Sequence, residues 1–150
     1  MKKSSKDIDS SLVARAAVIE LIVTGNWVQE RLTEALKPFN ISIPQFNVLR
    51  ILRGQKGKPA SLSCISEKMI HKMSNTTRLV DKLLQKSLVD RIICPNNRRK
   101  VEITITAKGL ELLTELDRVV DTTQSGLVES LEPQEMDQLT SLLNKMREEK

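Results

Sequence analysis

Aromatic side chains are almost absent from this 150-residue chain, which has one Trp, two Phe and no Tyr. Its core must therefore be filled by aliphatic side chains, and long helices rich in Leu, Ile and Val would account for the composition. The length is that of one domain, large enough to bury a substantial core. No linker composition separates a second domain, so we expect a single unit.

Cysteine and histidine are scarce as well. Cys64 and Cys94 fit no zinc-binding spacing, and a metal site would have to be built largely without histidine, because His71 is the only one. We therefore expect no metal and no cofactor. Two unpaired thiols fit a reducing compartment, and we expect a cytoplasmic protein.

Long hydrophobic runs are missing. No segment approaches roughly 18 consecutive apolar residues, so the sequence predicts no transmembrane span, and no apolar run follows the basic N-terminus as in a signal peptide. Catalytic patterns are missing too: there is no Ser/His/Asp or Cys/His arrangement and no Gly-rich phosphate loop. We therefore predict that the chain is not an enzyme.

Charge is present in abundance and is unevenly distributed. Residues 68–108 carry ten Lys/Arg against three Asp/Glu, whereas residues 109–150 carry four against ten. The net charge of +5 therefore hides a basic middle and an acidic C-terminal part. A polyanion such as nucleic acid would be bound by the middle.

Apolar residues recur at helical spacing from about Ser10 to Lys37, which predicts one long helix. Gly25 would permit a bend within it, Pro38 would end it, and residues 1–9 are expected to be frayed. The apolar face exceeds what one small domain needs. We expect part of this helix to contact a partner chain.

Two further amphipathic helices are predicted between residues 107 and 149. Thr106 would cap the first, and the second would begin near Pro133. Together with residues 10–37, these helices are expected to form a dimer.

The stretch between the long helices predicts a helix-turn-helix. Ser42-Ile43-Pro44-Gln45 is a candidate capping box that opens a short helix, and the Ser-rich segment 61–63 opens a second. A third helix is predicted from Met73 to Leu84, with apolar residues at 73, 79/80 and 83/84 on its buried stripe. Short helices joined by a tight turn are typical of DNA-binding proteins.

A hairpin follows, made of Val89–Cys94 and Val101–Thr106 and joined by a basic segment, residues 95–100. Val101, Ile103 and Ile105 alternate with polar residues, as in a half-buried antiparallel strand. The fold class predicted for residues 42–106 is therefore a winged helix-turn-helix, within a mainly α-helical chain.

The candidate DNA-contacting residues lie on the third helix and on the hairpin. On the helix they are Ser74, Asn75, Thr76, Thr77, Arg78 and Lys82; on the hairpin they are Arg98, Arg99 and Lys100. Within a helix-turn-helix, the first turns face the major groove, where Arg can pair with guanine and Asn with adenine. The alternatives are an ordinary capped helix start and a solvated hairpin tip.

Three stretches resemble the MarR family of bacterial winged-helix regulators. They are Ile41-Ser42-Ile43-Pro44-Gln45-Phe46-Asn47-Val48-Leu49, then Ser74 to Leu83, and then Leu88-Val89-x-Arg91 with Asn97-Arg98-Arg99 and Ile105-Thr106-x-x-Gly109. The order of the elements also matches. The chain departs from the family pattern at Asn97, where Asp is usual, and at Ser87, where Gly is common.

The resemblance implies a homodimeric, sequence-specific regulator of transcription, a repressor, bound to a pseudo-palindromic operator on double-stranded DNA. It also implies a small lipophilic or phenolic effector between the dimer and DNA-binding parts, and oxidant sensing by Cys64 or Cys94 as an alternative to a plain packing role. Two other functions remain open: a non-specific architectural DNA binder and a winged-helix module that binds protein.

Overall fold

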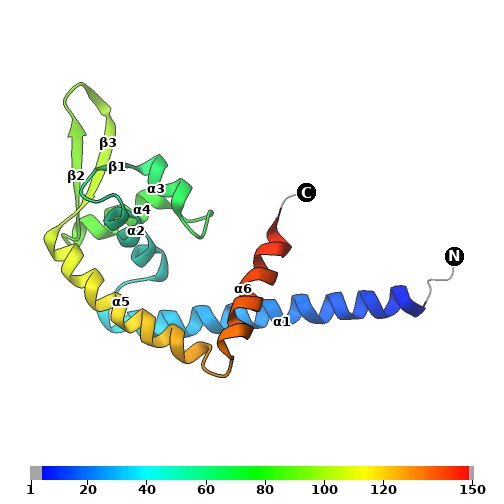
Figure 1. Ribbon diagram of the computed structural model, residues 1–150. Helices are drawn as coiled ribbons and strands as arrows, with labels where there is room; N and C mark the ends of the chain where they lie inside the picture. The colour runs from blue at the N-terminus through cyan, green and yellow to red at the C-terminus, as the bar shows by residue number, and fades with distance from the viewer. Residues whose placement is uncertain (1–4, 149–150) are drawn as a thin grey trace.

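The computed structural model describes residues 5–148, without the side chains of residues 5–8, Cys94, Arg98 and Arg99. Figure 1 shows a lobe formed by the middle of the chain, with long helices extending from it. The elements are α1 (Ser5–Leu36), the 3-10 helix η1 (Lys37–Phe39), α2 (Ile43–Gly54), β1 (Ala60–Ser61), α3 (Leu62–Lys68), α4 (Thr76–Gln85), β2 (Val89–Cys94), β3 (Asn97–Ile105), α5 (Ala107–Leu127) and α6 (Pro133–Arg147). The predicted fold class, mainly helical with a small antiparallel sheet, is confirmed.

The first helix is longer than predicted. It begins at Ser5 rather than near Ser10, so residues 5–9 are helical and not frayed, and it continues through Gly25. A glycine inside a helix costs only about 1 kcal/mol relative to alanine, which the hydrogen bonds of 32 residues offset. The helix ends at Leu36, and the chain passes into η1, where Pro38 lacks the N–H that a continuing helix would need.

The sheet has one strand more than predicted and a shorter turn. The two-residue strand β1 pairs with β3, placing Ala60 opposite Ile103. The strand β3 begins at Asn97, which pairs with Cys94, so the turn is Pro95-Asn96 and not a six-residue loop. A register shift beside Cys94 accommodates this tight turn. The three basic residues that follow Asn97 therefore lie in a strand.

The core joins every element of the lobe. Leu49 of α2, Ile65 of α3, Leu83 of α4, Ile103 of β3 and Leu113 of α5 are all fully or almost fully buried. Burying each such side chain stabilises the fold by roughly 1.5–3 kcal/mol. Because one core holds all five elements, the helix-turn-helix and the hairpin are fixed relative to α5.

The predicted caps of α2 and α5 are confirmed. The Ser42 side chain accepts a hydrogen bond from the Gln45 N–H, and the Gln45 side chain accepts one from the Ser42 N–H, which completes the capping box of α2. Thr106 caps α5 by accepting from the Gly109 N–H at 3.0 Å. These bonds satisfy N–H groups that have no partner within their helices.

The end of α4 and the start of α5 meet at a close backbone contact. A Cβ atom at Gly109 would lie 2.2 Å from the Leu88 carbonyl oxygen and 2.7 Å from a side-chain carbon of Ile105. The Thr106 hydroxyl also donates to the Ser87 carbonyl at 2.8 Å. Ser87 has φ +60°, a left-handed conformation that glycine adopts at lower cost, which explains why glycine suits this position.

The outer helices leave much apolar surface uncovered. Among the described side chains of α1, only Leu36 is buried, and Val13, Ile22 and Val23 are more than half exposed. No residue of α6 is buried. In Figure 1 the N-terminal half of α1 extends beyond the lobe.

One helical segment, Asp9–Phe39, is long and apolar enough to cross a membrane by length and composition alone. Its best window has a mean hydropathy of 1.4 and no buried residues. This segment contains no uninterrupted apolar run of that length, because charged side chains such as Arg15 and Glu20 interrupt it. A helix that pairs with a second chain meets the same criteria.

Gly109→Ala should destabilise the protein, because the added methyl group meets a backbone carbonyl that cannot move without shifting α4 or β2. We expect a loss of about 1–3 kcal/mol in the free energy of unfolding, measured by urea denaturation at fixed protein concentration. The control is Gly126→Ala in the same helix, where a Cβ atom meets nothing within 4 Å. That change should be neutral or stabilising. Equal stability of the two variants would contradict the close contact.

Candidate nucleic-acid interface

Helices α3 and α4 form the predicted helix-turn-helix, and α2 anchors the turn between them. The Asn47 side chain of α2 accepts a hydrogen bond from the Ile70 N–H at 2.9 Å. Ser61 caps α3 by accepting from the Cys64 N–H at 3.1 Å. The Ser61 cap fixes the start of α3, and the Asn47 bond holds the turn after α3 against α2.

The first turn of α4 starts later than predicted. Asn75 is the cap, and its side-chain oxygen accepts from the Arg78 N–H at 3.1 Å, so the helix begins at Thr76. Met73 lies before the helix and is 88% exposed, so its predicted place on the buried stripe is wrong. The rest of the stripe is confirmed, with Val80 and Leu83 buried. An Asn cap was the alternative interpretation of Asn75, and it is present.

The predicted contact residues of α4 do not all face solvent. Asn75, Thr77 and Arg78 are exposed and Ser74 is half-buried. Thr76 is only 8% exposed, and its buried hydroxyl oxygen has no hydrogen-bond partner among the described residues. Thr76 therefore cannot reach a ligand in front of the helix, because the packing of α4 turns it inward. We remove Thr76 from the candidate contacts.

Lys82 follows Arg78 by one turn of α4 and is exposed. It lines a hollow with Lys37 and Lys86 at the C-terminal half of the helix, behind the first turn. Partial burial and the neighbouring Lys82 charge both lower the pKa of Lys86. Lys82 thus lies on the same face of α4 as Arg78 and also lines this hollow, and its contact with DNA stays a prediction.

The hairpin projects from the lobe beside α3 and α4 (Figure 1). Lys100 is exposed, and its ammonium lies 3.5 Å from the Glu102 carboxylate. An exposed pair of this kind contributes little energy, so Lys100 can exchange its partner for a phosphate. The side chains of Arg98 and Arg99 lie outside the described part of the structure; their backbone lies in β3.

Arg91 was not among the predicted contacts, although it belongs beside them. It is exposed on β2, and its partner in the ladder is the buried Ile103, so both point toward α4. It lines a small cavity of about 40 Å³ with Thr77 and Asp81. The alternation of side chains along the strand was the signal in the sequence that indicated this position. Because the ladder partner of Arg91 is buried, the Arg91 side chain must lie at the edge of the core.

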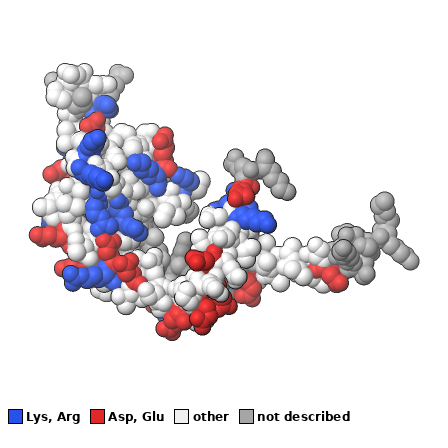
Figure 2. Space-filling view, viewed as in Figure 1, with Lys and Arg blue, Asp and Glu red and all other residues white. Residues whose placement is uncertain are grey.

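Figure 2 shows that the charge division of the sequence is also a division in space. Lysines and arginines gather on the lobe that holds the helix-turn-helix, and acidic side chains gather along α5 and the turn to α6. A long-range field of this kind directs a polyanion to the lobe.

A cavity of about 390 Å³ separates the lobe from α1. Its lining is mostly apolar and includes Leu36, Phe46 and Met69, with Arg50 and His71 as its ionisable groups. The Arg50 guanidinium lies 5.6 Å from the centroid of the Phe46 ring. A flat ring carrying one negative group would suit an apolar wall with a cation at its edge.

Of the two cysteines, the structure describes the surroundings of Cys64. Cys64 is free and half-buried in α3, and its sulfur accepts a hydrogen bond from the Gln55 amide nitrogen at 4.0 Å. Among the described residues, no three His, Cys, Asp or Glu side chains gather as metal ligands. The Cys94 side chain lies outside the described residues.

Comparisons with known proteins agree with this geometry. The sequence model of the MarR family matches residues 41–101, which span α2 to the middle of β3. A MarR transcription factor from Planctomyces limnophilus is 26% identical, with a TM-score of 0.70 over 96% of this chain and 98% of that one.

Two other solved structures bear on ligands. A cysteine-to-serine variant of E. coli MarR complexed with operator DNA is 23% identical, with a TM-score of 0.77 over 92% of this chain and 96% of that one. Bordetella bronchiseptica BpsR, whose DNA binding is regulated by 6-hydroxynicotinic acid, is 22% identical, with a TM-score of 0.76 over 87% and 91%. Residues 41–101, which hold the helix-turn-helix, match the MarR family, and nearly the whole chain shares its fold with a solved MarR transcription factor.

Proposed function

We propose that this protein is a transcriptional repressor that binds a pseudo-palindromic operator as a homodimer. The observation that carries the proposal is the exposed first turn of α4, with Asn75, Thr77 and Arg78 presented beside a basic hairpin. Arg78 would pair with a guanine and Asn75 with an adenine in the major groove. Lys100, with Arg98 and Arg99, would contact the phosphates or the minor groove.

The dimer would be formed by α1, α5 and α6. The uncovered apolar side chains of α1 and the absence of buried residues in α6 support this, because a soluble chain rarely leaves so large an apolar face in water. A two-fold dimer would present two copies of α4 to the same side of the duplex. Their half-sites would lie about one helical turn, roughly 34 Å, apart.

The apolar cavity between the lobe and α1 would hold the effector. 6-Hydroxynicotinic acid, which regulates BpsR, is a flat ring with one carboxylate, and Arg50 and His71 could bind such a group here. A ligand wedged between α1 and α2 would alter the separation of the two α4 helices, and the operator would then be released.

Arg78→Ala should lower operator affinity and relax the base preference at one position of each half-site. The expected cost is about 1–3 kcal/mol per half-site, because a bidentate contact to guanine is lost. The measurement is selection of duplexes from a random pool, followed by binding isotherms on the selected sequence. Thr76→Val is the matched control: it alters the adjacent turn but changes only a buried side chain, so it should leave the selected sequence unchanged.

If wild-type protein selects no sequence from the pool, the chain is an architectural DNA binder and not a repressor of one operator. If it retains no duplex at low salt, the lobe binds protein instead. Either result would reject the proposal.

Asn75 can be tested for two roles with two substitutions. Asn75→Ala should lower the free energy of unfolding by about 1 kcal/mol, because the cap of α4 is lost. Asn75→Asp should keep that stability, since Asp is an equally good cap, yet weaken DNA binding through repulsion between its carboxylate and the duplex. Thermal unfolding and fluorescence anisotropy measure the two effects. Full DNA affinity in Asn75→Asp would show that Asn75 only caps the helix.

Ile22→Asp should dissociate the dimer, because it places a charge on the exposed apolar face of α1. Light scattering in detergent-free buffer should give a dimer mass for wild type and a monomer mass for the variant. Ile22→Met keeps the apolar surface and should remain dimeric. A wild-type monomer, or a wild-type chain that stays in solution only with detergent, would contradict a dimer role for α1.

A further inference from the structure

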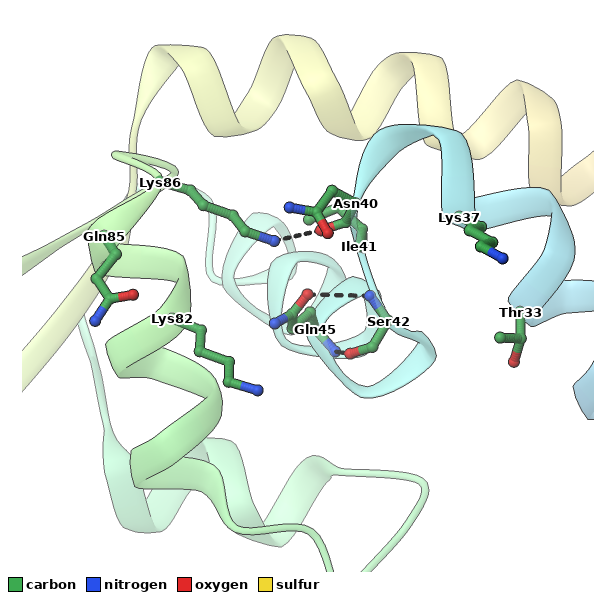
Figure 3. Close-up of a pocket in the computed structure, with 9 residues that line it drawn as sticks. All are labelled: Thr33, Lys37, Asn40, Ile41, Ser42, Gln45, Lys82, Gln85 and Lys86. Atoms are coloured by element: carbon green, nitrogen blue, oxygen red, sulfur yellow. Dashed lines mark hydrogen bonds between the residues drawn. The ribbon is translucent and has the colours of Figure 1, made fainter.

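A second hollow, adjacent to the apolar cavity and sharing Thr33 and Ser42 with it, is lined by three lysines. It has a volume of about 510 Å³ and lies between the end of α1, the start of α2 and the C-terminal half of α4. Figure 3 shows Lys82 and Lys86 reaching into it from the α4 side, and Lys37 of η1 on its opposite side with its ammonium pointing away from them. None of its lining residues is Asp or Glu.

The positive charge in this hollow is not compensated from within the described chain. None of the three ammonium groups lies within 4 Å of a carboxylate of the described residues. The Lys86 ammonium donates instead to the Asn40 carbonyl oxygen, a neutral acceptor. Its pKa is lowered because it is partly buried and because the Lys82 charge is close. An anion bound in the hollow would relieve the repulsion between Lys82 and Lys86 and would gain a third cation from Lys37.

Neutral hydrogen-bonding groups lie between the lysines. The Ser42 hydroxyl oxygen accepts from the Gln45 N–H at 3.2 Å, which leaves its own O–H able to donate. Thr33 and Gln85 contribute a hydroxyl and an amide to the lining. Ammonium and hydroxyl donors around one hollow are the groups that bind phosphate oxygens in proteins.

The hollow lies away from the end of α4 that would read DNA. Lys86 follows Arg78 by eight residues, which corresponds to about 12 Å along a helix axis. Its far wall is formed by α1 and the start of α2 rather than by the hairpin. A compact anion fits between these walls better than the backbone of a duplex bound at the first turn of α4.

We propose that this hollow binds a free small molecule that carries two linked phosphate groups, held by Lys37, Lys82 and Lys86. Its roughly three negative charges at neutral pH would match the three lysines. Because the site joins α1 to α4, bound ligand would also hold the dimer helices against the reading helix; this consequence rests on the function proposed above, whereas the binding itself does not.

The probe is inorganic pyrophosphate, titrated into the full chain at low salt and neutral pH by isothermal calorimetry. We expect one site per chain. Lys37→Gln and Lys86→Gln should each weaken binding by roughly tenfold or more, because a charge-assisted contact is lost. Lys145→Gln, which removes an exposed charge on α6, is the matched control and should bind as wild type does.

Several results would overturn the proposal. They are absence of pyrophosphate binding, equal weakening in all three variants, which would indicate general charge attraction, and unchanged affinity in Lys37→Gln. Lys86→Gln removes the bond to Asn40 and could unfold the region, so Lys37, which is exposed, is the decisive position. Circular dichroism of each variant identifies a folding defect.

A parallel titration with duplex DNA distinguishes a free phosphate compound from the DNA backbone as the ligand of the hollow. If pyrophosphate does not bind but Lys37→Gln weakens binding to a random duplex, the hollow holds the DNA backbone and the proposal is wrong. If pyrophosphate binds with the expected lysine dependence while no duplex binds, the hollow is an anion site and the proposed repressor function fails alone.

Discussion

The arrangement of α4, the hairpin and α5 depends on the close contact between Gly109 and the Leu88 carbonyl. At this point α4 has just ended, β2 begins, and α5 starts toward the outer helices. The Leu88 carbonyl also accepts the Thr106 N–H, and the Ser87 carbonyl accepts the Thr106 hydroxyl. Helix α4, the hairpin and α5 are therefore joined within a few residues, without a flexible linker between them.

A second contact, between α2 and α5, holds the same group of elements together. The Arg53 guanidinium of α2 pairs with the Asp117 carboxylate in the middle of α5. Both groups are partly exposed, so the pair adds little stability and serves mainly to fix orientation. The close contact at Gly109 and the ion pair between Arg53 and Asp117 together fix α5 along half of its length. A rotation of α5 must therefore carry the whole helix-turn-helix with it.

Local patterns predicted most of this molecule. The helices followed from apolar spacing, the capping box from four adjacent residues, and β3 from strict alternation. The strand β1 was missed because a two-residue strand has no period, and only its pairing with β3 defines it. The predicted length of the hairpin turn was wrong, because Arg98 to Lys100 are polar, as loop residues usually are.

The site was less predictable than the fold. Which side of the first turn of α4 faces inward depends on packing against other elements, so Thr76 could not be distinguished from Thr77 by residue type. Arg91 was passed over for the same reason. The hollow lined by lysines could not be predicted from the sequence. Lys37 and Lys86 are separated by almost fifty positions of sequence, and only the tertiary fold brings them together.

The uncovered half of α1 also determines the order in which the molecule can fold. The lobe has a core of its own, so its collapse is an event within one chain. In proteins, most of the stability of a helix comes from packing of its apolar face against other elements. The N-terminal half of α1 would therefore become stable only when two chains meet. Refolding should then have a fast phase that is independent of concentration and a later, second-order phase whose rate rises with the amount of protein.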